Sequence, residues 1–186
     1  MTTRIIPAAL AAGLLVTSSA IALAASPERS AKIEAFAHMP SSSAANAISA
    51  AEHSSRGTVL GIRYELGKDQ YRVDLLEHGK LMTANVDPMT DSVGPGSPLG
   101  RRAARELKHE QAVEQMLKPG STSLRQAVEM AQQRSRGKVI DAYLVLRQGK
   151  PAYEIGVING TRMHAVFFDP LSNKWLAHTT KMPVKS

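Results

Sequence analysis

The sequence contains no cysteine, so every site that depends on cysteine is excluded. The chain has no disulfide, no thiolate metal ligand and no thiol nucleophile. Aromatic residues make up only 4% of the chain and do not alternate with basic residues, which argues against a surface that stacks nucleic-acid bases. Stability must therefore come from core packing, and no nucleic-acid partner is expected.

Motifs of the common enzyme classes are also missing. The sequence has no Gly-x-Ser-x-Gly elbow, and the glycines at 94–97 lack the Gly-Lys-Ser/Thr ending of a phosphate-binding loop. His109-Glu110 lacks the second histidine of a zinc-protease helix, and the six histidines are dispersed. We therefore predict that the chain is not an enzyme.

The N-terminal residues 1–24 have the layout of a secretory signal peptide. Arg4 precedes an apolar run over residues 5–16, and the segment ends in Ala22-Leu23-Ala24, which is typical of a cleavage site. An uncleaved membrane anchor is the alternative. Cleavage after Ala24 would leave a periplasmic protein without a membrane span. Its net charge of +7 before cleavage favours acidic proteins, anionic lipid or cell-wall polymers as partners.

An internal repeat organises the rest of the chain. Ser55-Arg56-Gly57 recurs as Ser135-Arg136-Gly137, and Asp87-Pro88 recurs as Asp169-Pro170. The two motifs lie slightly farther apart in the second copy, and this difference falls between the first and second expected strands, where a hairpin loop can absorb it. We therefore expect two copies of one structural unit.

Each copy has the pattern of one helix followed by three strands. The helices are expected at about 44–55 and 124–135, with Gly57 and Gly137 at their C-caps. In the first strands, the alternating residues of copy one match those of copy two: Leu60, Ile62, Tyr64 and Leu66 match Ile140, Ala142, Leu144 and Leu146. Of these, Leu60, Ile62, Leu144 and Leu146 are expected to be buried in the core. The third strands are expected at about 81–87 and 162–169. The fold class predicted is α+β, with each helix packed on a three-stranded antiparallel meander.

Additional helices are expected before each copy, at about 28–38 and 99–117. The predicted organisation is a signal peptide (1–24), an N-terminal helix (25–40), repeat 1 (41–93), a linker with a charged helix (94–120) and repeat 2 (121–186).

The helix, the meander and the aspartate-led closing turn resemble the PepSY domain, here twice in tandem over 41–93 and 121–177. The family's usual turn is Asp-x-x-Thr-Gly, whereas these turns end in Asp91 and Asn173. The resemblance implies exported or membrane-tethered proteins. It also implies inhibition and chaperoning of the protease in metalloprotease propeptides, and unclear or metal-linked roles elsewhere.

The outward strand positions differ between the copies. Copy one presents charges, and copy two presents an apolar set beside Asp141 and Glu154: Val139, Tyr143, Val145, Met163 and Phe167. An outer face this apolar should be covered, by the other copy, by the preceding helix or by a partner protein. We predict that Tyr143, Phe167, Val145 and Met163 bind a periplasmic protein partner, with the two aromatic residues as anchors.

A hard metal cation is the alternative ligand. Glu106, Glu110 and Glu114 fall on one arc of the expected helix at 99–117, where their like charges repel unless something cationic offsets them. The Asp-Pro turns offer further oxygens from Asp87, Asp91 and Asp169. Without thiolates or clustered imidazoles, calcium or a lanthanide would suit these ligands best. A solvated helix face and ordinary turn chemistry explain the same residues without a metal.

Overall fold

The computed structural model describes residues 27–39, 43–98, 108, 111–160 and 162–183. The helices are α1 (Pro27–His38), α2 (Ala44–Ser55) and α4 (Leu124–Ser135). The strands are β1 (Thr58–Glu65), β2 (Gln70–Glu77), β3 (Lys80–Val86), β4 (Ser97–Pro98), β5 (Lys138–Arg147), β6 (Lys150–Asn159), β7 (Arg162–Asp169) and β8 (Lys174–Pro183). The predicted signal peptide lies outside the described residues.

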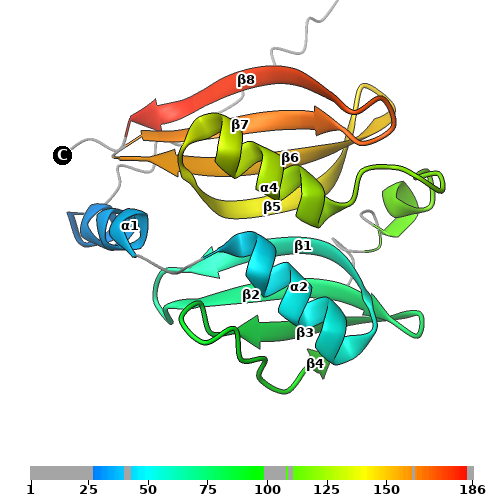
Figure 1. Cartoon of the computed structure of the whole chain (residues 1–186), viewed down its shortest axis with the longest axis horizontal. Helices are drawn as coiled ribbons and strands as arrows, with labels where there is room; N and C mark the ends of the chain where they lie inside the picture. The colour runs from blue at the N-terminus through cyan, green and yellow to red at the C-terminus, as the bar shows by residue number, and fades with distance from the viewer. Residues whose placement is uncertain (1–26, 40–42, 99–107, 109–110, 161, 184–186) are drawn as a thin grey trace, which may run out of the picture.

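Within the described part of the chain, eight strands form one antiparallel sheet in the order β4-β3-β2-β1-β5-β6-β7-β8. Helices α2 and α4 lie side by side on one face of this sheet, α2 over β1–β3 and α4 over β5 and β6 (Figure 1). The fold is therefore α+β, as the sequence predicts. The two groups of strands join through β1 and β5, which pair over 61–63 and 141–143.

Both sheet-covering helices begin and end where the sequence predicts. Ser43 caps α2 by accepting a hydrogen bond from the backbone N–H of Asn46, and Ser123 caps α4 in a capping box with Gln126. The C-caps differ from the prediction, because the left-handed residues are Arg56 and Arg136, each just before the expected glycine.

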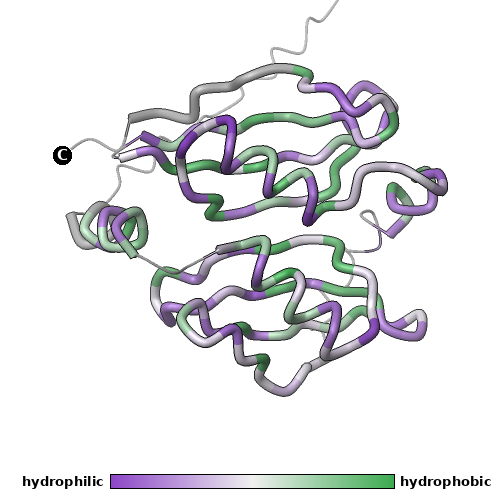
Figure 2. The backbone as a smooth tube through the Cα atoms, viewed as in Figure 1, coloured by the Kyte–Doolittle hydropathy of each residue, from purple (hydrophilic) through white to green (hydrophobic). Residues whose placement is uncertain are grey.

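The buried core lies between the helices and the sheet, and Figure 2 shows hydrophobic residues recurring along the strands there. Leu60, Ile62 and Leu144 are at most 2% exposed, as predicted. The prediction for Leu146 is wrong, because its side chain is 42% exposed. Leu146 pairs with Pro151 close to the tip of the β5–β6 hairpin, past the part of the sheet that the helices cover.

A β-bulge changes the side-chain alternation in β5. Val139, predicted on the outer face, is fully buried in the core. The register of β5 and β6 shifts between Val139 and Asp141, so that Ile140 is an extra residue and Val139 shares the inner face with Ala142. β1 has the same irregularity between Val59 and Gly61, and Val59 is likewise buried.

The second group of strands, β5–β8, has one strand more than the sequence pattern predicts. β8 pairs with β7 along most of its length, although the sequence pattern predicts only three strands in this unit. Trp175 in β8 packs on Phe168 in β7, with 5.0 Å between ring centroids. This aromatic pair extends the core beyond β7.

Two helical segments close the ends of the junction between β1 and β5. Phe36 of α1 is 1% exposed and packs on Tyr64, with 4.2 Å between ring centroids. At the opposite end, Val113 in the helical stretch over 111–114 is 2% exposed within the same core (Figure 1). The segments that precede the two helix–sheet units therefore contribute to one continuous core.

Candidate functional site

The predicted partner-binding residues Tyr143 and Phe167 share one row on the sheet face opposite to the one that α2 and α4 cover. Tyr143 in β5 pairs with Glu154 in β6, and Glu154 pairs with Phe167 in β7. Side chains alternate between the faces of a strand, and the neighbouring Leu144 and Phe168 point into the helix-covered core. The two aromatic side chains therefore lie on the opposite face, on either side of a carboxylate.

Tyr143 also belongs to the junction between the two halves of the sheet. It pairs with Gly61 of β1, and a Cβ atom at Gly61 would lie 2.6 Å from Cδ1 of the Tyr143 ring. The ring therefore covers the glycine, and the tyrosine side chain is half-buried. Tyr143 thus has a structural contact in addition to any role in binding.

Phe167 lies under an arginine. The Arg147 guanidinium is 3.9 Å from the centroid of the Phe167 ring, a cation–π contact. Nη1 of Arg147 is buried and has no hydrogen-bond partner among the residues that the structure describes. Arg147 also lines a hollow of about 350 Å³ together with Lys150, Asp169 and Leu176. Two basic groups, one carboxylate and apolar groups therefore meet at this end of the face.

The other two predicted contact residues are also half-buried. Val145 pairs with Ala152, one step along the face from the Tyr143 row. Met163 pairs with Ile158 and packs against the core, which reduces the area it offers to a partner. Tyr143, Val145 and Phe167 thus form the accessible part of the predicted surface, and we call this set the outer face.

Both Asp-Pro turns use their aspartates to hold the backbone. Oδ1 of Asp87 accepts hydrogen bonds from the backbone N–H groups of Met89 and Thr90, at 2.7 and 3.1 Å. Oδ1 of Asp169 does the same for Leu171 and Ser172, at 2.8 and 3.2 Å. Each carboxylate therefore has the geometry of an Asx-type turn, in which one oxygen is already occupied by donors.

The last residues of the turns connect to the starts of the helices. Asp91 and Asn173 both have left-handed backbones, with φ of 54° and 55°. The Asp91 carboxylate accepts a hydrogen bond from the Asn46 side chain at 3.5 Å, and the side-chain oxygen Oδ1 of Asn173 accepts one from the Thr122 hydroxyl at 3.4 Å. The missing glycine of the family turn is thus replaced by residues that tolerate this conformation.

The carboxyl pKa values agree with this structural role. Hydrogen bonds from the backbone of Met89 and Thr90 lower the pKa of Asp87. For Asp169, partial burial raises the pKa, but the hydroxyl and backbone N–H of Ser172 and the backbone N–H of Leu171 together outweigh it, so that the net pKa is lowered. Both turns are therefore held by ionised carboxylates at neutral pH.

Replacing Asp169 by alanine is expected to cost about 1 kcal/mol of stability at pH 7, the value of a hydrogen-bonded turn acceptor. The folded pKa lies below the unfolded value of about 3.9, so this contribution is present above pH 4 and is lost as the pH falls through the folded pKa. Urea unfolding of wild type and Asp169→Ala at pH 7 and pH 3 tests this. A stability difference that is the same at both pH values would contradict it.

The three glutamates proposed as metal ligands are not brought together by the described residues. Glu106 and Glu110 lie outside the described part of the chain. Glu114 is half-buried near Tyr153, whose pKa is raised by burial and then by the Glu114 charge. Across the described residues, no group of three or more histidine, aspartate or glutamate side chains is positioned to hold a metal ion.

One polar hollow next to Asp87 was not anticipated from the sequence. It has a volume of about 350 Å³ and is lined by Lys68, Asp69, Gln70, Asn85, Asp87, Ser92 and Gly94. The hydroxyl of Tyr64 is buried near Asp69, and the pKa of Tyr64 is raised to about 12 by burial and then by the charge and hydrogen-bonding influence of Asp69 and the charge of Asp87. Asp69 carried no signal in the sequence, because it lies in a hairpin loop where aspartate is common.

Comparison with known proteins identifies the family of one part of the chain. This part lies in the second unit, which comprises α4 and β5–β8, as the first unit comprises α2 and β1–β4. Residues 123–172 match the family model described as the peptidase propeptide and YPEB domain, PepSY. These residues form a PepSY domain. The domain contains α4, β5, β6 and β7, and it ends within the Asp169 turn. All four predicted partner-contact residues therefore lie inside the PepSY domain.

Other comparisons add little to the family match. None of the curated proteins matches the chain. A solved structure of a protein from Clostridium difficile 630, described as a "putative lipoprotein", is similar at 17% identity and a TM-score of 0.43. This similarity covers 76% of the present chain and 94% of the other, and it supports no conclusion about function. In the described residues, no helix has the length and apolar character needed to cross a membrane.

Proposed function

We propose that this chain is an exported, non-enzymatic module that binds a protein partner and regulates or chaperones it. The observation that carries the proposal is the position of the outer face within the PepSY domain, a domain that the family description links to peptidase propeptides. Tyr143, Val145 and Phe167 occupy the sheet face that α4 does not cover. A partner that packs against this face would bury apolar side chains that are now half-exposed.

The positive charges at the hairpin end of the outer face, away from Glu154, suggest an acidic group of the partner at this end. Arg147 and Lys150 lie at the hairpin end of the face, and the buried Nη1 of Arg147 finds no acceptor within the described part of the chain. A carboxylate from the partner would satisfy this donor while apolar neighbours pack on Phe167. The positive net charge of the chain would favour the approach of such a partner.

We further propose that residues 41–93 are a second copy of the same unit. The pairing of β1 with β5 supports this, because Ile62 pairs with Ala142, which occupies the equivalent position of the second copy. The edge strands support it as well, because two pairs between β3 and β4 have equivalents between β7 and β8. Met82 with Pro98 corresponds to His164 with Thr180, and Thr83 with Ser97 corresponds to Ala165 with Thr179.

Export through the signal peptide at residues 1–24 is part of the same proposal. It depends on the sequence pattern alone: a positive start, an apolar run and an Ala-x-Ala site. A periplasmic location would bring the chain into contact with secreted proteins, which are the partners that PepSY propeptides serve.

Replacing Tyr143 and Phe167 together by serine is expected to weaken partner binding at least tenfold, because both central apolar anchors are lost. Purified wild type and variant would be compared by quantitative affinity capture from periplasmic extract, followed by titration with each captured protein. Leu171→Ser, which changes an exposed leucine on the β7–β8 turn, is the matched control. Equal binding by wild type and the double variant would contradict the proposed surface, provided that both melt cooperatively.

The hollow at Asp87 favours a hard cation, calcium or a lanthanide, as the second candidate function. Asp69, Asp87 and Asn85 offer oxygen ligands there, and the one lysine in the hollow, Lys68, is paired with Glu65 at 3.0 Å. Calorimetric titration of chelator-treated protein with calcium, a lanthanide and zinc tests this candidate. Hard ions should bind better than zinc and should lose affinity in Asp87→Asn, whereas absence of heat with every hard ion would contradict it.

A further inference from the structure

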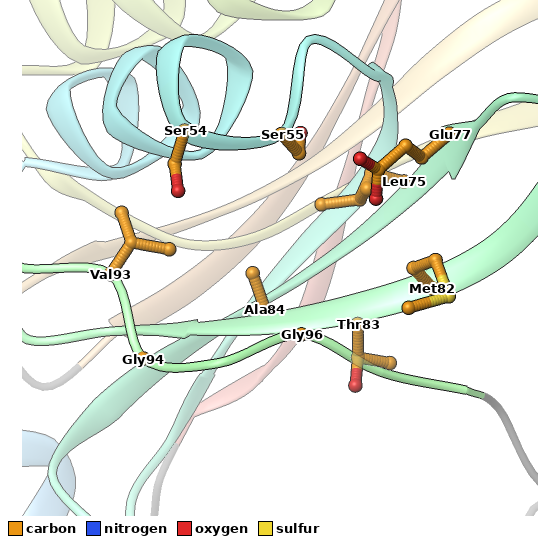
Figure 3. A pocket seen from close by; sticks show the side chains of 10 residues that line it. All are labelled: Ser54, Ser55, Leu75, Glu77, Met82, Thr83, Ala84, Val93, Gly94 and Gly96. Atoms are coloured by element: carbon orange, nitrogen blue, oxygen red, sulfur yellow. The ribbon is translucent and has the colours of Figure 1, made fainter.

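The first unit contains a hollow on the helix side of the sheet, between the last turn of α2 and strand β3 (Figure 3). Its volume is about 220 Å³. Leu75, Ala84 and Val93 provide apolar walls, and Ser54 and Glu77 place polar groups at the rim. This hollow is separate from the outer face, since Leu75 and Ala84 belong to the helix-covered core.

The equivalent place in the second unit is filled by a tryptophan. Val93 forms an isolated bridge with Val86, and Trp175 pairs with Phe168 at the equivalent positions of the second unit. The Trp175 ring packs edge-on against Phe168, and the Arg134 guanidinium lies 5.4 Å from its centroid. The second unit therefore shows which kind of side chain this place accepts.

Smaller side chains in the first unit explain why the hollow is open. Val93 stands where the second unit has Trp175, Ala84 stands where it has Val166, and Ser54 stands where it has Arg134. The edge strand is also shorter. The stretch Gly94-Pro95-Gly96 precedes the two-residue β4, whereas β8 continues through the equivalent positions.

The polar rim differs from that of the second unit in charge. Glu77 occupies the place of Asn159, and the cation that covers Trp175 has no counterpart at Ser54. An aromatic ligand in the first unit would thus meet a carboxylate and a hydroxyl. A basic group beside the aromatic ring would supply the missing cation and pair with Glu77.

We propose that this hollow binds an aromatic side chain of the tryptophan type, presented by an extended peptide segment of another protein and followed or preceded by a basic residue. The segment would lie beside the stretch 93–98 at the outer edge of the unit, so that its ring enters the place that Trp175 fills in the second unit. The inference is independent of the outer face, because it uses a different side of the sheet and the other unit.

An acetylated peptide with the chain's own sequence over 174–180 is a suitable probe, because it carries a lysine next to the tryptophan. Titrated into the purified chain, it should shift the backbone amide resonances of Ala84 and Val93 and leave those of Val166 unchanged. The same peptide with alanine in place of tryptophan should bind at least tenfold more weakly. Binding by both peptides alike, or no shift up to millimolar peptide, would overturn the proposal.

Filling the hollow from within provides the second arm of the test. Val93→Trp should raise the melting temperature and lower peptide affinity at least tenfold, while Leu171→Trp, on an exposed turn, should change neither. Should Val93→Trp fail to fold, Ala84→Leu occupies the same space with a smaller side chain. Unchanged peptide binding in a folded filled variant would overturn the proposal. If the wild-type chain self-associates and the filled variant does not, the occupant of the hollow is a second copy of this chain, and the assignment to a peptide of another protein is overturned.

Discussion

Leu144→Ala is expected to lower the free energy of unfolding by about 2–5 kcal/mol. Leu144 is 2% exposed, and its side chain belongs to the core beneath the helices. Truncation removes buried methyl groups and leaves a cavity. The backbone cannot move to close this cavity, because Leu144 is paired with Tyr153 in the middle of β5 and β6. Denaturant unfolding followed by circular dichroism measures the loss.

Leu146→Ala is the matched control for that substitution. It changes the same residue type two positions along the same strand, but Leu146 is 42% exposed, so the expected loss is below about 1 kcal/mol. Both side chains lie on the same face of β5, so the pair tests where the helix layer ends along the strand. Equal losses for the two variants would contradict the assignment of Leu144 beneath the helices and of Leu146 beyond them.

Gly137→Ala is expected to destabilise the fold by about 1–3 kcal/mol, because a methyl group there has no space. The added Cβ would collide with the backbone carbonyl oxygen of Ile158 and would lie 2.7 Å from a methyl carbon of Val157. A backbone oxygen within a ladder cannot rotate away, so β5 must move relative to β6. Thermal or urea unfolding measures the effect.

Gly67→Ala supplies the control for the glycine variant. Apart from its two chain neighbours, no described residue has an atom within 4 Å of a Cβ built at Gly67, and the Gly67 backbone is outside the left-handed region. Its stability should therefore stay within about 1 kcal/mol of wild type, with any change toward greater stability. Gly137 lies between α4 and β5, close to strand β6. A Gly137→Ala variant as stable as Gly67→Ala would contradict this close approach.

Local sequence signals predicted the elements that depend on local chemistry. The serine N-caps at Ser43 and Ser123 fixed the starts of α2 and α4, and the apolar spacing along each helix fixed its buried face. The glycine at each helix end was correctly noticed but wrongly explained. It is needed for close packing against the next strand, whereas Arg56 and Arg136 adopt the left-handed conformation.

Features that depend on the partner strand could not be predicted in the same way. A bulge leaves no mark in the alternation of one strand, so Val139 was placed on the wrong face. β8 contains Trp175 and a mixed polar sequence without regular alternation, and its pairing with β7 is set by contacts across the sheet. The same limit applies to Leu146, whose exposure depends on where the helix layer ends.

The candidate site was predicted in part. The aromatic residues Tyr143 and Phe167 were correctly placed on one face by their alternation, and the structure adds their shared row with Glu154. Arg147, which covers Phe167, was missed because a single arginine near a hairpin resembles ordinary surface charge. The hollow next to Val93 becomes visible only when the two units are compared in space.

Site-specific photo-crosslinking from the outer face tests the central claim most directly. A benzophenone amino acid replaces Phe167 in one variant and Thr83 in another. Thr83 lies on the same face of the sheet in the distant strand β3, next to the edge strand β4. Irradiation in the periplasm should give a protein adduct from position 167 and not from position 83, and the Tyr143→Ser substitution should reduce that adduct. No adduct from position 167, or equal adducts from both positions, would contradict a partner bound at the outer face of the PepSY domain.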